Sequence, residues 1–304
     1  MNLKITKNIK EANLITHSSS FHPDDVFSTM FLSKIIKNPI VCRTNNPENA
    51  NKNAIVYDIG FGKFDHHGPD ALYRENPKLK YCSFGLLWKE YGLQYLETIN
   101  KDEKEILFKA IDENLIMQID GIDNGVFPKI EAQYKLTDLD KVIDLFNNAW
   151  NEEKDNDENF LIALSVAEKI FDRMIVKENA KILANKKVEE QINTVKDGIL
   201  ILDEYLPYQE AIFASKNPRA KEIKVVIFPS NRGGYNIKPM TISKDSKELA
   251  YKFSKEFNGL HDEELAKISK IKTARFVHAS GFLACSETLD DAILLAENAI
   301  NNKE

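Results

Sequence analysis

The chain has 304 residues, of which 43% are hydrophobic and 29% are charged, and its net charge at pH 7 is −6. This length predicts two domains, each large enough to bury a core. The acidic balance argues against a dedicated nucleic-acid-binding protein, which usually has a strong basic excess, so any contact with a polyanion would be local or through metal ions.

The first half of the chain alternates short apolar runs with segments of helical periodicity. Within 24–38, for example, Val26, Met30 and Phe31 recur near a helical spacing. Strands are predicted at 13–16, 39–44 and 54–60, and helices at 24–38, 83–96 and 101–119. Strands that alternate with helices in this way are typical of an α/β protein with a parallel, two-sided sheet.

The second half begins with a polar, acidic stretch at 151–159, which is the predicted linker, with an exposed loop inside one domain as the alternative. The elements predicted after it are a helix at 160–196, strands at 198–204, 223–230, 233–242 and 274–286, and helices near 245–257 and 288–301. This order indicates a smaller α+β domain. The predicted domains are therefore 1–150 and 151–304.

Cysteine usage and hydropathy predict a soluble cytoplasmic protein without membrane contact. Cys42, Cys82 and Cys285 are widely spaced and form no CxxC pair, which argues against a disulfide framework and a structural zinc cluster. No run approaches the roughly 18 apolar residues of a transmembrane helix. The N-terminus also lacks the apolar core of a signal peptide.

Four of the six histidines lie in two short stretches, 14–26 and 60–68, and aspartates accompany them. Both stretches lie at or just beyond the ends of predicted strands. The residues concerned are His17, His22, Asp24, Asp58, Asp65, His66 and His67. Because ligands bind beyond the carboxyl ends of the strands in a parallel α/β sheet, we expect these side chains to converge on one site.

The chemistry of this residue set indicates divalent metal ions. Clustered carboxylates repel one another, and burying them unpaired is costly unless a cation offsets their charge. Mixed aspartate and neutral histidine ligands suit Mn²⁺, with Mg²⁺, Fe²⁺, Co²⁺ and Zn²⁺ as alternatives. The candidate ligands are too many for one ion, which favours two ions that lie close together.

A further metal-binding acid is expected near the end of the 101–119 helix, where Asp120 and Asp123 both lie. An acid at a helix C-terminus opposes the macrodipole, and a cation would offset that cost. The alternative is that Asp123 only opens a turn with Asn124 and Gly125. Each motif alone has a simpler explanation of this kind, since Asp24, for example, is a good helix N-cap. The combination is far more specific.

The ordered motifs HSSSFHPDD, IVYDIG, FDHH and IDGIDNG resemble the DHH superfamily of metal-dependent phosphoesterases. With FVHASGF at 276–282, they are most similar to its Myg-one branch, which is named for a melanocyte-proliferating gene. The resemblance implies an α/β fold with an N-terminal DHH-type domain, a smaller C-terminal α+β domain, and an active site in the cleft between them. The chain departs from the superfamily at His22, where an aspartate is usual, and at LACS after FVHASGF, where relatives carry glycines.

The resemblance also implies a role for each matching residue. One metal ion would be held by His17, His22 and Asp58. The other would be held by Asp24, Asp58, His66 and either Asp123 or Asp120. Asp58 would thus bridge the two ions, His67 would face the substrate phosphate, and Asp65 would orient a neighbouring histidine.

Residues of the second domain are expected to contact the substrate. The resemblance implies that His278, Ser280 and Gly281 close over it. Arg232 with Gly233 and Gly234 also suits a phosphate, because a guanidinium and glycine backbone bind it well. A hairpin turn is the simpler explanation of the arginine–glycine segment.

The implied activity is hydrolysis of a phosphoester by water activated between two metal ions. The closest resemblance implies a 3′–5′ exonuclease that acts on RNA or short oligonucleotides. The alternatives are a hydrolase of a small phosphate compound, such as a nucleotide, a cyclic dinucleotide or pyrophosphate, and a non-catalytic regulatory protein that binds metal. A homodimer stays open.

Overall fold

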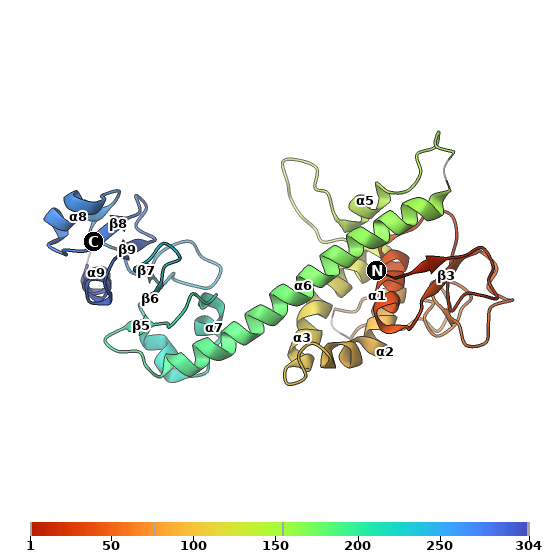
Figure 1. The fold of residues 1–304 in the computed structure, drawn as a ribbon, viewed down its shortest axis with the longest axis horizontal. Coiled ribbons are helices and arrows are strands. Elements are labelled where there is room, and N and C mark those ends of the chain that lie inside the picture. Colours follow the sequence, from red (N-terminus) through yellow and green to blue (C-terminus); the bar gives the residue numbers. More distant parts are fainter. Residues whose placement is uncertain (1, 76, 154, 303–304) are drawn as a thin grey trace. The chain divides into compact units, whose positions relative to one another are not determined.

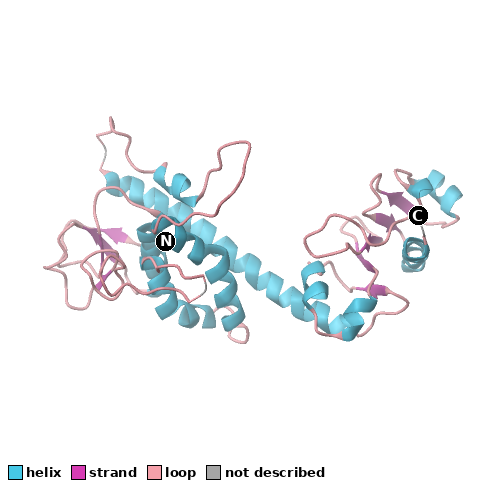
Figure 2. Cartoon of the chain, turned by 180° about the vertical axis from the view of Figure 1, so that it is seen from behind, coloured by secondary structure: helices cyan, strands magenta, loops and turns pink. Residues whose placement is uncertain are grey.

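The computed structural model describes residues 2–75, 77–153 and 155–302. The chain forms two compact units, Met1–Asn179 and Ala180–Glu304. Each unit contains its own sheet (Figures 1 and 2). The predicted α/β class with a mainly parallel first sheet is confirmed.

The sheet of the first unit has four strands in the order β1-β3-β2-β4, and every pair is parallel. The strands are β1 Lys4–Ile5, β2 Leu14–Thr16, β3 Ile40–Arg43 and β4 Ile55–Val56. The predicted strand 54–60 is therefore much shorter than expected. Asp58 has a φ of 56°, a left-handed conformation that ends the extended chain. The two-residue β1 has too few residues for a period-2 pattern and was not predicted.

The helices of the first unit pack mainly on one another, to one side of the sheet (Figure 1). They are α1 Pro23–Ile35, α2 Ser83–Glu97, α3 Lys104–Ile111, the π-helix η1 Asp112–Ile116, α4 Met117–Asp123, α5 Leu139–Asp144 and α6 Asn156–Ile192. The predicted helix 101–119 is confirmed as the continuous run from α3 to α4. A π-helical turn inside a helix often marks a functional site.

An aromatic cluster packs α1, α2 and α6 together. The ring of Phe31 lies 5.6 Å from Trp88 and 5.9 Å from Phe171, both edge-on, and Phe84 lies 6.0 Å away. All four side chains are buried. Edge-to-face pairs at these distances add to the burial of apolar area. The cluster therefore fixes α1, whose first turn carries two of the site's aspartates.

The long helix α6 spans the predicted helix 160–196 for most of its length and contributes residues to both compact units. Within the predicted linker 151–159, α6 already begins at Asn156, and residue 154 lies outside the described residues. The division at 150/151 stays a prediction. Among the described residues, no helix, α6 included, combines the length and apolar character needed to cross a membrane.

The second unit contains a mixed five-stranded sheet in the order β5-β6-β7-β9-β8. Its strands are β5 Ile199–Ile201, β6 Val225–Pro229, β7 Tyr235–Pro239, β8 Ala274–Val277 and β9 Ala284–Ser286. Its helices are α7 Gln209–Ala214, η2 Pro218–Glu222, η3 Lys255–Phe257, α8 Asp262–Ser269 and α9 Leu289–Asn301. Only β5 and β6 pair in parallel. The predicted strand 274–286 is split into β8 and β9 by a turn.

The predicted helix near 245–257 is wrong, because only the short 3₁₀ turn η3 forms there. Phe253 and Phe257 are buried four residues apart, which imitates a helical pattern. The backbone between them bonds to α9 instead, since the Ser254 N–H donates to Asn298 Oδ1 at 3.0 Å. The short helices α5, α7 and α8 were not predicted, because six to eight residues give little periodicity.

Candidate metal centre

Most of the predicted site residues of the first unit line one pocket of about 570 Å³. Those residues are His17, His22, Asp58, His66, His67 and Asp123. Asp24 lies beneath the pocket and is fully buried, and Asp65 lies beside Asp58, His66 and His67. The predicted convergence at the strand ends is therefore what the structure shows.

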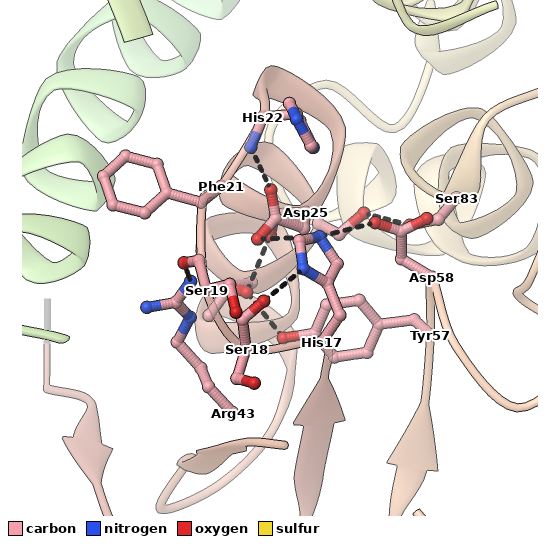
Figure 3. Close-up of polar contacts among 12 residues, drawn as sticks. His17, Ser18, Ser19, Phe21, His22, Asp25, Arg43, Tyr57, Asp58 and Ser83 are labelled. Carbon is pink, nitrogen blue, oxygen red and sulfur yellow. Dashed lines mark hydrogen bonds and ion pairs between the residues drawn. The ribbon is translucent and has the colours of Figure 1, made fainter. Parts of the chain in front are cut away.

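The first turn of α1 places its carboxylates by ordinary helix capping. Pro23 occupies the first helical position, where its missing N–H is not needed. The backbone N–H of His22 donates to Asp25 Oδ1 at 2.7 Å, the reciprocal half of a capping box (Figure 3). The positive end of the helix dipole favours Asp24 and Asp25 there. Two carboxylates thus sit where β2 delivers the chain to α1.

Asp58 lies between two histidines. Its Oδ2 is 3.2 Å from His17 Nε2, and its Oδ1 is 3.5 Å from His66 Nδ1. The left-handed backbone at Asp58 is held by its N–H, which donates to the Phe64 carbonyl at 3.0 Å. Strained backbone of this kind persists where the surrounding structure fixes it. The turn aims the carboxylate at the pocket, between histidines from two different segments. Figure 3 shows its contact with the first of them, His17.

Several buried carboxylate oxygens in this cluster make no hydrogen bond to any described residue. They are both oxygens of Asp24, Oδ2 of Asp25 and Oδ1 of Asp58. Burial, and then the charges of Asp58 and Asp123, raise the pKa of Asp24 well above its usual range. The pKa of Asp58 is raised in the same way, by burial first and then by Asp25. Such groups are costly unless a cation is present.

The donor atoms fit a divalent metal ion. Ligand atoms of Asp24, Asp25 and Asp58 lie within 4.8 Å of one another, and so do those of Asp24, His66 and Asp123. A third group combines His17, His22 and Asp25. Carboxylate and imidazole donors without thiolates suit ions such as Mn²⁺. A fourth group combines Asp58, Asp65, His66 and His67. The overlap of the groups at Asp24, Asp25 and Asp58 fits two neighbouring ions better than one.

The two adjacent histidines differ in exposure. The side chain of His66 is 4% exposed, and its Nε2 lies 2.8 Å from Asp123 Oδ2. The side chain of His67 is 56% exposed, and its Nδ1 lies 2.7 Å from Asp65 Oδ1. His66 is therefore a candidate ligand, whereas His67 faces the open pocket with its orientation fixed by Asp65.

Asp65 is held as a carboxylate. Burial alone would raise its pKa, but the backbone N–H groups of His67 and Phe61 and the His67 side chain outweigh burial and lower it. The two N–H groups donate at 3.0 and 2.7 Å. An ionised Asp65 keeps the hydrogen on His67 Nδ1, so the other ring nitrogen points away from it.

Asp120 and Asp123, the alternatives left open by the sequence, are separated by the structure. Asp120 Oδ2 accepts a hydrogen bond from Arg74 Nε at 2.6 Å, and its Oδ1 accepts the Cys82 N–H at 2.9 Å. Both of its oxygens are thus engaged away from the cluster. Asp123 lies in the pocket beside His66 instead. The structure places Asp123, not Asp120, among the candidate ligands.

Exchanging each acid for its amide is expected to give opposite results. Asp120→Asn should lower the free energy of unfolding by about 1–3 kcal/mol, because an amide cannot accept from both Arg74 Nε and the Cys82 N–H, although Asp112 still pairs with the Arg74 guanidinium. It should leave Mn²⁺ affinity unchanged. Asp123→Asn should weaken Mn²⁺ binding by about tenfold or more with little loss of stability. Chemical denaturation and calorimetric Mn²⁺ titration of both variants measure this. The reverse pattern would reassign the ligand.

Arg43 on β3 holds the loop that carries His17 and His22. Its guanidinium donates to the Ser19 carbonyl at 2.5 Å and to Asp157 Oδ1 at 3.0 Å (Figure 3 shows the first contact). It also lies 4.4 Å from the centre of the Phe160 ring. The charge is buried but paired, which fixes the loop against α6.

Three residues of the site were missed from the sequence. Asp25 is fully buried and belongs to two of the candidate metal groups, and its place three residues after His22 was the available signal. Asp140 on α5 lines the pocket, and Arg43 supports the loop, but neither lies in a recognisable motif. Their roles depend on contacts with residues more than 20 positions away.

The predicted residues of the second unit lie in two turns. His278, Ser280 and Gly281 form the β8–β9 turn, in which His278 Nδ1 lies 2.8 Å from the Ser280 hydroxyl. The Gly281 N–H donates to the His278 carbonyl at 2.8 Å. The segment Arg232, Gly233 and Gly234 forms the β6–β7 hairpin turn, which was the alternative explanation of this segment in the sequence. Their contact with substrate stays a prediction.

Comparisons with known proteins bear on the identity of the chain. The sequence model MYG1_exonuc, an uncharacterised protein family (UPF0160), matches residues 13–300. The MYG1 protein of Dictyostelium discoideum is 28% identical over 322 residues, covering 96% of this chain and 98% of that protein. The MYG1 exonuclease of Homo sapiens is 24% identical over 314 residues, covering 92% and 84%. The solved structure of PggH, a pGpG-specific phosphodiesterase from Vibrio cholerae, aligns over 96% of this chain and 100% of its own chain. The two are 14% identical and superpose with a TM-score of 0.33, which is too low to establish a shared fold.

Proposed function

Because the chain belongs to the MYG1 exonuclease family, we propose that it is a metal-dependent phosphoester hydrolase that shortens RNA or short oligonucleotides in the 3′–5′ direction. The family match over residues 13–300 confirms the resemblance to the Myg-one branch. Relatives that cover most of this chain carry the name exonuclease. The substrate and the cleavage direction are part of the proposal.

One observation supports the hydrolytic site above all others. Asp24 is fully buried with neither carboxylate oxygen hydrogen-bonded to a described residue, and Asp58 and Asp123 lie beside it. A fold that only needed a stable core would replace such a group with an apolar or amide side chain. An unpaired acid beneath an open pocket is what a metal-dependent hydrolase requires.

The proposed ligands form two overlapping sets. His17, His22, Asp25 and Asp58 would hold one ion. Asp24, Asp58, His66 and Asp123 would hold the other. Bound divalent ions, Mn²⁺ in this proposal, would lower the pKa of water and offset charge on phosphate oxygens.

The remaining residues act on the substrate or on the ligands. Asp65 fixes the ring of His67, which is then oriented to contact an oxygen of the phosphate from the open side of the pocket. In its imidazolium form, His67 would donate a hydrogen bond from the ring nitrogen that does not face Asp65. A donor placed where charge develops lowers the barrier to hydrolysis. Arg43 keeps the loop of His17 and His22 in place.

Hydrolysis by the metal-stripped protein, with and without added Mn²⁺, tests the proposal. A 5′-labelled short RNA and pyrophosphate are run in parallel. We expect stepwise, Mn²⁺-dependent shortening of the RNA, and we expect His67→Ala to reduce its rate by about a hundredfold, because one transition-state donor is lost.

The two substrates separate the alternatives. Turnover of pyrophosphate without shortening of RNA would keep the site and move the function to small phosphates. Protein that binds Mn²⁺ and hydrolyses neither would contradict the nuclease proposal. RNA shortening by His67→Ala at the wild-type rate would remove His67 from the mechanism.

A further inference from the structure

The two faces of the C-terminal sheet are covered unequally. On one face, Val225, Ile227 and Ile237 are buried in a cluster that includes residues of α9. On the other face, Val226 and Phe228 are buried with residues of α6 and α7, which cover β5 and β6. The continuation of this second face over β7, β9 and β8 is hollowed by a pocket of about 670 Å³.

A row of paired residues crosses the sheet at this pocket. Phe228 pairs with Asn236, Asn236 with Cys285, and Cys285 with Phe276. All four line the pocket, so they present side chains on the same face. The row gives the pocket a floor that runs over four strands and carries an aromatic ring at each end.

Further rings stand beside the ends of the row. Tyr205 is 61% exposed, and its ring centre lies 5.2 Å from that of Phe228. The ring of His261 is stacked on Phe276, with the centres 5.0 Å apart. Rings displayed on an open sheet face are the surface on which single-stranded bases stack.

The charge of the pocket opposes that of the whole chain. Its lining includes Arg232 and Arg275 and no acidic residue, although the chain has a net charge of −6. Arg275 is fixed by Glu287 at 2.9 Å and by the Gly233 carbonyl at 3.3 Å. The Arg232 guanidinium has no hydrogen bond or ion pair with any described residue, so all of its donors are available. Guanidinium groups of this kind bind phosphate.

We propose that this pocket of the second unit binds single-stranded nucleic acid, with one base stacked against Phe276 and a phosphate held by Arg232. The class of ligand rests on the proposed function. The pocket adds a binding surface beyond the metal centre, and it gives an acidic protein a local means of holding a polyanion.

Fluorescence anisotropy with a labelled single-stranded RNA, in EDTA so that metal-dependent hydrolysis is absent, tests this inference. Arg232→Ala is expected to weaken binding about fivefold and to lower the slope of log Kd against log salt concentration by about 0.7. Phe276→Leu keeps apolar packing but removes the ring, and is expected to weaken binding about tenfold. On an RNA strand with abasic positions, which offers no base to stack, Phe276→Leu and the wild-type protein should bind with the same affinity.

Arg173→Ala removes an exposed arginine of α6 in the first unit and is the matched control for charge. The far-ultraviolet circular dichroism spectrum of each of the three variants should match that of the wild type, which shows that the fold is kept. Unchanged RNA affinity in both pocket variants would overturn this inference and leave the proposed function standing. If both pocket variants bind RNA more weakly but the wild-type protein does not hydrolyse RNA, the pocket inference stands and the proposed function is overturned.

Discussion

Replacing Asp58 with asparagine is expected to reduce Mn²⁺-dependent hydrolysis by about a thousandfold while the fold is kept. Among the described residues, Asp58 is the carboxylate that lies between His17 and His66, with its two oxygens directed at different histidines. It is therefore shared by both proposed ligand sets. Losing transition-state charge stabilisation of about 4 kcal/mol corresponds to a rate reduction of that size.

Steady-state hydrolysis of a labelled RNA at saturating Mn²⁺, together with far-ultraviolet circular dichroism, measures the effect. Asp70→Asn is the matched control, since Asp70 is an exposed acid of the same unit outside the pocket. The control should retain the wild-type rate. Asp58→Asn protein that hydrolyses within about threefold of the wild type would exclude a bridging role for this residue.

Asp24→Asn is expected to stabilise the metal-free protein and to abolish most of its stabilisation by Mn²⁺. In the absence of metal, the Asp24 carboxylate is fully buried without a hydrogen bond to a described residue, and burial, followed by the charges of neighbouring acids, raises its pKa. The neutral amide removes that repulsion, which we expect to raise the free energy of unfolding at neutral pH by roughly 1–3 kcal/mol. The same change removes a proposed ligand, so Mn²⁺ should bind the native state more weakly and raise its free energy of unfolding by less.

Thermal unfolding in EDTA and again in Mn²⁺, for the wild type and the variant, gives both quantities from one experiment. Asp70→Asn again serves as the control and should shift neither curve. A variant that is less stable than the wild type in EDTA would show that Asp24 is structurally satisfied. A Mn²⁺-induced shift equal to that of the wild type would show that it is not a ligand.

The pair of variants distinguishes two kinds of carboxylate in one cluster. Asp58 is held by a strained turn and lies at the pocket surface, so its loss is expected to act mainly on rate. Asp24 lies beneath the pocket, so its loss is expected to act strongly on stability as well. A site that holds like charges together usually lowers the stability of the metal-free protein in favour of activity. A variant that removes one of the charges is therefore expected to gain stability and to lose activity.

The short motifs by themselves determined most of the candidate metal centre. His17, His22, Asp58, His66 and His67 follow strand ends, and parallel strands bring their carboxyl ends to one edge of a sheet. That rule needs only the order of elements, which periodicity supplies. Family membership rests on the same motifs, because they are local in sequence and specific in combination.

The tertiary structure alone decided between residues that look alike in sequence. Asp120 and Asp123 lie on one helix, but Arg74, 46 positions away, binds Asp120, while Asp123 meets His66. Phe253 and Phe257 are spaced as in a helix, but hydrogen bonds to α9 hold that backbone in another conformation.

These outcomes depend on partners that are remote in sequence. Local propensity and periodicity describe what a segment prefers by itself, whereas the burial of a carboxylate and the pairing of its oxygens are decided by whatever packs against it. For this chain, the sequence determined which residues gather at the strand ends. The packing of α1, α2 and α4 against one another decided which acids on α1 and α4 are left without an arginine or lysine partner and are thus suited to hold metal.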